Sequence, residues 1–278
     1  MFETNRFAGV TLDVPRIMGI INVTPDSFSD GGEAWLLDDA LARGHAMIAA
    51  GADMLDIGGE STRPGAEPVD QKEEIARVIP VIRALAADGV LVSIDTRHAE
   101  VMRASIAAGA RIVNDVTALT GDDGSLAVVA DAGVDVILMH MQGEPRTMQV
   151  RPSYKDVVKD VYSFLDSRIS ACKSAGVPQE RIAVDPGIGF GKALQHNLAL
   201  IAHIDTLQSL GTAVVLGASR KQFIGQISDA EEVADRVMGS VASVLAARAR
   251  GAQIFRVHDV IETRQALSVW EAITNARR

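Results

Sequence analysis

The stretch DTRHAEVMRASIAAGARIVND, residues 95–115, contains one complete unit of the pattern that decides the fold. A helix-like segment, residues 98–108, ends at Gly109, and the apolar run RIVND follows. A glycine is expected at this junction because a chain commonly leaves a helix through a left-handed conformation, which a Cβ atom disfavours. Residues 95–114 have just enough length for a short helix, the glycine and one strand. The sequence therefore predicts a tight repeat of helix, glycine and strand.

The same unit occurs on both sides of this stretch. Its junction glycines are Gly51, Gly89, Gly109, Gly133, Gly176, Gly211 and Gly251. The runs that follow them are MLDIG, VLVSID, RIVND, VDVILMH, RIAVD, AVVLGAS and QIFRVH, and an earlier run, IMGIIN, occupies residues 17–22. The strands are expected to be hydrophobic on both faces, as they are in a parallel sheet that helices cover.

Eight strands that alternate with helices predict an α/β fold, the (β/α)8 or TIM barrel, and the length of 278 residues fits that fold. A doubly wound open sheet has the same local pattern and remains an alternative at this point. We expect a single domain over residues 1–278, because no Pro/Ser-rich linker or low-complexity tract divides the chain. Within it we expect an N-terminal extension (1–16), the eight strands (17–258) and a final helix (259–278).

Composition excludes several classes of partner. The chain has 27 Lys and Arg against 36 Asp and Glu, a net charge of −9, and no basic stripe interleaved with aromatic residues, so we expect no nucleic-acid partner. No run approaches the roughly 18 apolar residues of a membrane span. The first residues lack the apolar region of a signal peptide, so we expect a cytoplasmic protein. Cys172 stands in a helix-like segment without a nearby base, and we assign it no role.

Polar residues follow the predicted strands, where a barrel opens into its active site. Four of them suit a flat heterocycle with adjacent N–H donors and a ring carbonyl: Asp95, Asn114, Asp185 and Lys221. Carboxylates accept from an amino group and a neighbouring ring N–H, an amide both donates and accepts, and a lysine donates to a carbonyl. These residues favour a guanine-like or pterin-like ring. Alternatively, Asp95 and Asp185 are helix N-caps.

A second group of residues suits phosphate. Arg63, Arg256 and His258 come from different loops, and helix N-termini add N–H donors. We therefore expect a phosphorylated ring compound as ligand. The glycines of DPGIGFGK, residues 185–192, lack the spacing of a nucleotide-binding P-loop.

Other polar residues keep two interpretations. Asp56 lies within a strand and either supports the following loop, residues 58–64, or contacts a ligand. His140 either caps a strand or takes part in the site. The histidines and the cysteine do not have the spacing of a transition-metal site, and no Ser/His/Asp triad is evident.

Several segments together resemble the bacterial dihydropteroate synthase family of pterin-binding enzymes. They are MGIINVTPDSFSDGG (18–32), GADMLDIGGESTRPGAEPV (51–69), SIDT (93–96), VNDV, MHM, DPGIGFGK (185–192), GASRKQFIG (217–225) and RVHDV (256–260). The match runs from the first predicted strand to the last, and its first two segments are highly specific.

The resemblance implies an alkyl (non-methyl) transferase of folate biosynthesis. It would condense 6-hydroxymethyl-7,8-dihydropterin pyrophosphate with p-aminobenzoate, with Mg²⁺, to give 7,8-dihydropteroate and pyrophosphate. By similarity, Asp95, Asn114, Asp185 and Lys221 hold the pterin, with Asp95 and Lys221 catalytic, and Asn22, Arg63, Arg256 and His258 hold the pyrophosphate, with Asn22 on the metal side.

The resemblance also implies a lid and a second pocket. The loop VTPDSFSDGG, residues 23–32, would order over pyrophosphate with the help of Asp30. Phe28, Thr62 and Pro64 would form the p-aminobenzoate pocket, and backbone N–H groups of the helix that begins near Gln222 would hold the substrate carboxylate. Sulfonamides are expected to compete there.

Two other functions remain alternatives. A corrinoid-linked pterin methyltransferase presents a similar Asp, Asn, Asp set but should lack the lid segment and the SRK segment, residues 219–221, both of which are present here. A non-catalytic pterin-binding paralogue should have lost lid or phosphate residues. The family also suggests a homodimer, formed through the apolar helix pair at residues 232–250, which could equally be a well-buried helix of the outer ring.

Overall fold

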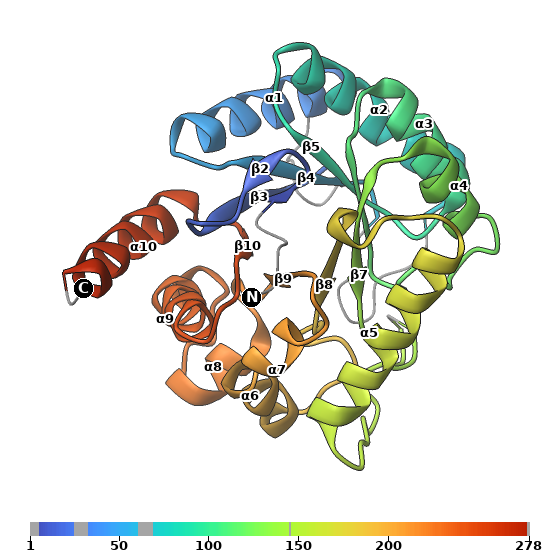
Figure 1. Ribbon diagram of the computed structural model, residues 1–278. Helices are drawn as coiled ribbons and strands as arrows, with labels where there is room; N and C mark the ends of the chain where they lie inside the picture. Colours follow the sequence, from blue (N-terminus) through green and yellow to red (C-terminus); the bar gives the residue numbers. More distant parts are fainter. Residues whose placement is uncertain (1–5, 25–32, 61–68, 145, 277–278) are drawn as a thin grey trace.

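The computed structural model describes residues 6–24, 33–60, 69–144 and 146–276 (Figure 1). The barrel strands are β3 (Arg16–Asn22), β4 (Met54–Gly58), β5 (Val92–Asp95), β6 (Ile112–Asp115), β7 (Asp135–Met139), β8 (Ile182–Asp185), β9 (Ala213–Leu216) and β10 (Ile254–Val257). They are all parallel and close in the order β10-β3-β4-β5-β6-β7-β8-β9. The predicted TIM barrel is confirmed, and the open doubly wound sheet is excluded because β10 pairs with both β9 and β3. The predicted single domain stays a prediction.

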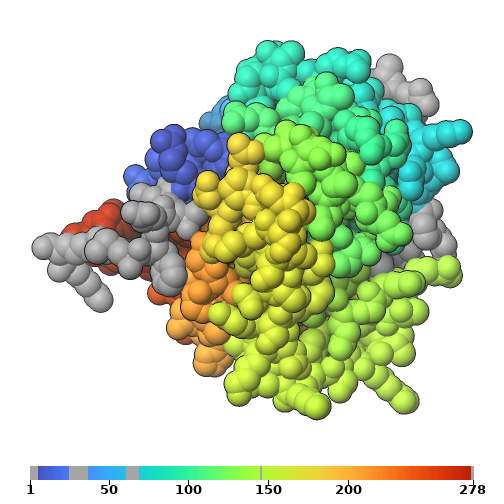
Figure 2. Space-filling view, turned by 45° about the vertical axis from the view of Figure 1, so that its right-hand side comes forward, coloured from blue at the N-terminus to red at the C-terminus, as the bar shows by residue number. Residues whose placement is uncertain are grey.

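Helices surround the strands as an outer ring (Figure 1). They are α1 (Glu33–Ala49), α2 (Gln71–Ala87), α3 (Ala99–Ala108), α4 (Ser125–Ala132), α5 (Val157–Ser174), α6 (Leu194–Ala202), α7 (Asp205–Gln208), α8 (Gln222–Ser228), α9 (Val237–Arg248) and α10 (Val260–Asn275), with short 3-10 turns η2 (Gln179–Arg181) and η3 (Ala234–Arg236). The surface in Figure 2 passes from green through yellow to orange, so segments that are neighbours in sequence are also neighbours around the ring. In the part of the chain that the structure covers, no helix is both long and apolar enough to cross a bilayer.

The junction glycines have the backbone conformation that the sequence predicts. All seven have a positive φ, between 62° and 118°. Gly109, at the end of α3, has the largest value, and a Cβ atom there would lie 2.6 Å from the Cβ of Ala86 in α2. Glycine is therefore required at this position both by the backbone and by the packing of two neighbouring helices.

The predicted N-terminal extension contains a small hairpin, β1 (Arg6–Phe7) paired with β2 (Val10–Thr11). Phe7, which is 1% exposed, packs with Met18, Met54 and Ile112 inside the amino-terminal end of the barrel. Burial of one such ring contributes about 2 kcal/mol. The hairpin therefore fills the end of the barrel opposite to the βα loops.

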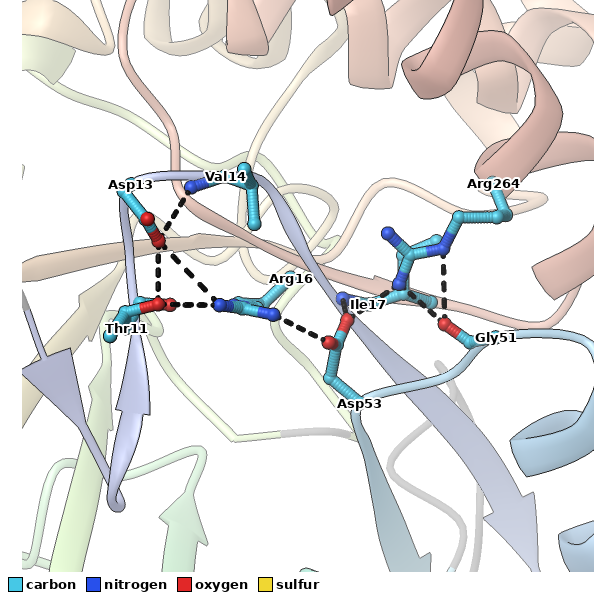
Figure 3. Close-up of polar contacts among 8 residues, drawn as sticks. All are labelled: Thr11, Asp13, Val14, Arg16, Ile17, Gly51, Asp53 and Arg264. Atoms are coloured by element: carbon cyan, nitrogen blue, oxygen red, sulfur yellow. Dashed lines mark hydrogen bonds and ion pairs between the residues drawn. The ribbon is translucent and has the colours of Figure 1, made fainter.

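A polar cluster holds the same end together (Figure 3). Asp53, just before β4, accepts hydrogen bonds from Arg16 Nη1 at 3.0 Å, from the backbone N–H of Ile17 at 2.8 Å and from Arg264 Nη2 at 2.6 Å. Arg264 Nε also donates to the carbonyl of Gly51 at 3.1 Å. These contacts tie α10 to the first two barrel strands, and residues at this end of a TIM barrel serve stability.

Candidate active site

The carboxyl ends of the strands bring the predicted site residues to one rim of the barrel. Strand register places Asn22 beside Gly58, Gly58 beside Asp95, and Asp95 beside Asn114. Asp185 ends β8 on the other side of the ring. Because every βα loop of this fold opens at the same rim, these side chains share one site.

Arg256 binds two carboxylates that come from different strands. Its Nε lies 2.6 Å from Asp56 Oδ2, and its Nη2 lies 2.6 Å from Asp95 Oδ2. Asn114 Nδ2 donates to the same Asp56 oxygen at 2.9 Å. We call these four residues the Arg256 cluster. Burial lowers the pKa of Arg256, but the neighbouring Asp56 and Asp95 more than offset this and raise it, so the guanidinium stays charged.

The two interpretations of Asp56 can now be compared with its contacts. Its side chain is fully buried, and its hydrogen bonds in the described structure go to Asn114 and Arg256. Residues 61–68 of the loop that it was expected to support lie outside the described residues. Asp56 therefore orients two predicted site residues, a function that its place inside a strand did not reveal.

Two buried carboxylate oxygens of the Arg256 cluster, Asp56 Oδ1 and Asp95 Oδ1, have no hydrogen-bond partner among the described residues. Buried polar atoms are usually paired, and an unpaired carboxylate oxygen accepts an N–H of a ligand or becomes protonated. Burial raises the pKa of Asp95, and the charge of Arg256 opposes that rise. The cluster thus offers acceptor atoms to a ligand with N–H donors.

Asp185 and Lys221 meet at the loop of residues 187–191. Asp185 Oδ1 accepts from the N–H of Gly187 at 2.7 Å, and Lys221 Nζ donates to the carbonyl of Ile188 and lies 4.5 Å from the centre of the Phe190 ring. Burial lowers the pKa of Lys221 to about 8, against the attraction of Asp185. Burial likewise raises the pKa of Asp185, against the charge of Lys221.

Asp185 and Arg256 come close to each other at Gly217, which follows β9. A Cβ atom there would lie 3.5 Å from Asp185 Oδ2 and 3.9 Å from the Cβ of Arg256. Asp185 therefore approaches the Arg256 cluster across this glycine, and a side chain at position 217 would narrow the space between them.

His258 follows β10 and is held by Ser219. The Ser219 hydroxyl lies 3.0 Å from His258 Nδ1 and accepts from the backbone N–H of His258 at 3.1 Å. The next residues, Arg220 and Asp259, form an ion pair that joins the same two loops. Gln222 is the first residue of α8, as the sequence predicts.

His140 is a buried residue with a partner that the sequence did not suggest. Its Nδ1 lies 3.0 Å from Lys192 Nζ, and burial together with the charge of Lys192 lowers the pKa of His140 to about 3, so the ring is neutral.

The glycines of DPGIGFGK, residues 185–192, allow the loop after β8 to pack closely against its neighbours. Cβ atoms at Gly187 and Gly191 would lie 2.0 Å from the His140 carbonyl oxygen and 2.3 Å from that of Gln142.

Five of the predicted site residues have no place in the described structure. Phe28, Asp30, Thr62, Arg63 and Pro64 lie outside the described residues. The side-chain contacts predicted for p-aminobenzoate, and one predicted phosphate contact, therefore stay predictions.

A magnesium ion suits the oxygen atoms near Asn22. A Cβ atom at Gly58 would lie 3.7 Å from Asn22 Oδ1 and 3.8 Å from Asp95 Oδ2, so both oxygens border the position of that atom, and Asp95 Oδ2 also binds Arg256. Mg²⁺ binds amide and carboxylate oxygens, keeps several waters, and often relies on substrate phosphates for the remaining ligands. Within the described ranges, no group of three His, Cys, Asp or Glu residues has the arrangement of a metal site. The residues fit a metal that arrives with a phosphate.

A hollow of about 380 Å³ lies at the opposite end of the barrel, beside the hairpin. Arg6, Arg111, Asp135 and Arg181 contribute to its lining. Ala8 donates to Asp135 there, and Arg181 donates to the Gly133 carbonyl, so these polar groups already serve to anchor the hairpin and a helix end. We place the active site at the carboxyl-end rim.

Comparison with known proteins gives a consistent result. The family model described as "Pterin binding enzyme" matches residues 18–258. The dihydropteroate synthase of Neisseria meningitidis serogroup B is 49% identical over 279 aligned positions, which cover 98% of this chain and 97% of that protein. The structure of Xanthomonas albilineans dihydropteroate synthase with 4-aminobenzoic acid is 51% identical and superposes with a TM-score of 0.90 over 95% of each chain. The Yersinia pestis dihydropteroate synthase in a sulfonamide drug complex is 46% identical, with a TM-score of 0.91 over 96% of each chain.

Proposed function

The chain belongs to the pterin-binding enzymes, among the dihydropteroate synthases, and from that premise we propose which of its residues perform each part of the reaction. The enzyme condenses 6-hydroxymethyl-7,8-dihydropterin pyrophosphate with p-aminobenzoate and releases 7,8-dihydropteroate and pyrophosphate, a step of folate biosynthesis. The predicted dihydropteroate synthase activity is confirmed, and the two alternatives, a methyltransferase and a non-catalytic paralogue, are set aside. Among the structural features, the Arg256 cluster supports this function best, because it presents unpaired carboxylate oxygens beside a cation at the rim.

The pterin ring is held by Asp95, Asn114, Asp185 and Lys221. The unpaired Asp95 Oδ1 and the Asp185 carboxylate accept N–H groups of the ring and its amino substituent, and Lys221 donates to the ring carbonyl or a ring nitrogen. Contacts of this kind distinguish a pterin strongly from other rings, because a ring without the matching N–H donors would leave buried carboxylates unpaired.

The pyrophosphate is held by Asn22, Arg63, Arg256 and His258. The guanidinium of Arg256 is already bound to Asp56 and Asp95, so its binding of pyrophosphate depends on these two contacts. Phosphate oxygens bind the remaining N–H donors of the guanidinium or compete with the carboxylates for those already used. The Ser219 hydroxyl holds the ring of His258 at the end of β10, the strand that also carries Arg256.

Bond breaking precedes bond making in the chemical step. The bond between the pterin methylene carbon and the pyrophosphate oxygen breaks, its electron pair leaves with the oxygen, and positive charge spreads from the methylene into the ring. Asp95 stabilises that charge, and Arg256 and His258 stabilise the departing oxygens. The amine of p-aminobenzoate then forms the carbon–nitrogen bond and gives its proton to solvent, so no strong general base is needed.

Magnesium is proposed to bind together with the pyrophosphate group. When bound, the ion withdraws electron density from the leaving oxygens and makes pyrophosphate a better leaving group. Asn22 would hold it through its amide oxygen. The waters and phosphate oxygens that Mg²⁺ prefers would complete its ligands.

The p-aminobenzoate pocket is assigned to Phe28, Thr62, Pro64 and the backbone at Gln222, with Asp30 ordering the lid. The first residue of α8 offers a backbone N–H to the carboxylate of this substrate. The Yersinia pestis enzyme holds a sulfonamide drug, and sulfonamides are proposed to compete with p-aminobenzoate here as well.

A homodimer is proposed through the region of η3 and α9. Within the predicted helix pair, residues 232–250, Val241 and Val244 are buried and belong to the fold of the monomer. Met238 and Val233 are 76% and 48% exposed, which leaves an apolar surface for a second copy. The cytoplasmic location stays a prediction from the sequence.

One assay tests the proposed function directly. Pyrophosphate release from the pterin pyrophosphate is measured with and without p-aminobenzoate and with and without Mg²⁺, and dihydropteroate is identified by mass. Release that matches dihydropteroate one to one, and that depends on Mg²⁺, is expected. Tight pterin binding without any product would contradict catalysis.

A further inference from the structure

Lys192 is a buried lysine that the reaction described above does not use. It lies between β8 and α6, in the last position of the segment DPGIGFGK, and is 2% exposed. Its ammonium group has three N–H donors and meets three acceptors: His140 Nδ1 at 3.0 Å, the His140 carbonyl oxygen at 3.2 Å and the Phe190 carbonyl oxygen at 2.9 Å. Burial of a lysine is costly, and full pairing of its donors is what makes this position tolerable.

These three contacts join two neighbouring strand ends of the rim. His140 follows β7, and Phe190 lies in the 187–191 loop that follows β8. The backbone N–H of His140 also donates to the carbonyl of Asp185 at 3.1 Å. The fit is close, because a Cβ atom at Gly187 would collide with the His140 carbonyl oxygen. Lys192 therefore bridges two loops that have no room to move closer.

The bridged loop carries the groups that contact Lys221 and Asp185. The carbonyl of Ile188 accepts from Lys221, the Phe190 ring lies against the same ammonium group, and Gly187 donates to Asp185. Lys192 itself reaches neither of these two side chains through a hydrogen bond in the described structure. Its charge acts on both groups through space, as a minor influence that lowers the pKa of Asp185, whereas its hydrogen bonds reach them through the backbone of residues 187–190.

We propose that Lys192 is a positioning residue for the pterin pocket, which fixes the 187–191 loop against His140 and thereby holds Asp185 and Lys221 in place for the ring. This inference rests on the proposed function for the identity of the ring. It assigns to Lys192 an effect on pterin affinity, and none on the pyrophosphate contacts of Asn22, Arg256 and His258, which come from other strands.

Neighbouring contacts support a loop that is built to be rigid. Asn197 Oδ1 accepts from the N–H of Gly189 at 2.7 Å, and Tyr154 Oη donates to the carbonyl of Gly191 at 2.7 Å. The His140 ring lies 4.9 Å, edge to face, from Phe164. Preorganised contacts of this kind matter because a displacement of about 1 Å in a binding group can cost up to about 100-fold in rate.

The test is the substitution Lys192→Met, which keeps the stem and removes the three donors. Its affinities for 6-hydroxymethylpterin and, separately, for pyrophosphate with Mg²⁺ are measured by calorimetry, together with KM for each substrate. Pterin affinity is expected to fall about 10- to 100-fold, while pyrophosphate affinity and KM for p-aminobenzoate stay within about twofold of wild type. Lys159→Met, at a side chain that is 82% exposed, is the matched control and should change nothing.

Other outcomes are decisive as well. Unchanged pterin affinity in a folded Lys192→Met protein overturns the proposal, and so does an equal loss for pterin and pyrophosphate, which would indicate a general structural role. If Lys192→Met does not fold, His140→Phe removes one acceptor but keeps an aromatic ring, and it should weaken pterin binding alone, by a smaller factor. A wild-type protein that binds pterin but forms no dihydropteroate would contradict the proposed function and leave this binding test intact.

Discussion

Arg256 Nη2 lies 2.6 Å from Asp95 Oδ2, although the two residues are 161 positions apart in the chain. The contact exists because the last barrel strand closes onto the first and brings both side chains to the rim. It means that the carboxylate proposed to stabilise the pterin cation and the guanidinium proposed to bind the leaving group already form an ion pair. Phosphate oxygens must share or take over this guanidinium, and the negative charge of Asp95 then becomes more available to the pterin.

The first prediction concerns the charge of Asp95. Asp95→Asn keeps the size of the side chain and removes the charge that stabilises the developing cation. We expect the barrier to rise by about 3 to 4 kcal/mol, the scale for loss of one preorganised electrostatic contact. The loss should appear in kcat, measured by pyrophosphate release at saturating substrates.

Asp131→Asn is the matched control for this experiment, because Asp131 is an exposed residue of α4. It should leave kcat unchanged. Near-normal turnover of Asp95→Asn would show that the anion is not needed in the transition state.

The second prediction concerns Asn22 and magnesium. Asn22→Ala is expected to weaken Mg²⁺-dependent pyrophosphate binding by about 10- to 100-fold, which corresponds to the roughly 1.5 to 3 kcal/mol of one contact to a charged group. Removal of Mg²⁺ with EDTA should abolish pyrophosphate release and leave the binding of 6-hydroxymethylpterin intact, and added Mg²⁺ should restore release. Calorimetry with pyrophosphate, with and without Mg²⁺, measures the first effect.

Asn275→Ala, near the exposed end of α10, provides the control substitution. An Asn22→Ala protein that binds pyrophosphate and Mg²⁺ like wild type would remove Asn22 from the metal side of the site.

The barrel could be predicted from the sequence because its signals are local. A run such as MLDIG forms its strand, Met54–Gly58, over the same residues, and Gly109 ends a helix where a left-handed conformation is needed. The hairpin at residues 6–11 had no such signal, since strands of two residues have no periodicity. Phe7 and its contacts inside the barrel stabilise it instead.

The site could be predicted only in part for the same reason. Asp95, Asn114 and Asp185 stand at strand ends, so their shared rim follows from the order of the elements. The pairing of Arg256 with Asp56 depends on how the barrel closes, and the contacts of Lys192 depend on the packing of two loops. Neither leaves a pattern in the sequence.

The third prediction concerns Lys221, whose pKa is lowered to about 8 by burial. The ammonium form, which donates to the pterin, is present below that pH and is lost as pH rises through it. We expect kcat/KM for the pterin pyrophosphate to fall above about pH 8 because the free enzyme then loses this charge, which also faces Asp185, Arg256 and Asp95. A profile of kcat/KM from pH 6 to pH 10 measures this alkaline limb.

Lys221→Arg distinguishes Lys221 from other groups that titrate in this range. An arginine stays protonated throughout, so whatever activity this variant retains should not show the alkaline limb. If the same limb persists in the arginine variant, another group is responsible for it.

The last prediction concerns Glu74, a carboxylate in α2 that is completely buried next to Gly59. Neither of its carboxylate oxygens has a hydrogen-bond partner among the described residues, and a Cβ atom at Gly59 would lie 3.0 Å from its Cγ. Burial raises its pKa from 4.5 to about 7, against a smaller opposing effect of the nearby Thr96. A raised pKa means that the folded protein binds a proton more tightly than the unfolded chain, so this residue costs stability as pH rises from about 4.5, and the full cost is present above about 7.

Glu74→Gln removes this cost because a neutral amide replaces the carboxylate at similar size. The free energy of unfolding, from urea titrations, should rise relative to wild type by on the order of 3 kcal/mol at pH 8.5, at about 1.4 kcal/mol per pKa unit. Near pH 4.5 the difference should be small, because the wild-type carboxyl is then protonated in the folded protein and about half protonated in the unfolded chain, so little of the cost is present. Asp166→Asn, at an exposed residue of α5, should change stability little at either pH. A Glu74→Gln protein that is less stable than wild type at pH 8.5 would mean that the ionised carboxylate is stabilised by its surroundings, and that its burial is not the dominant effect.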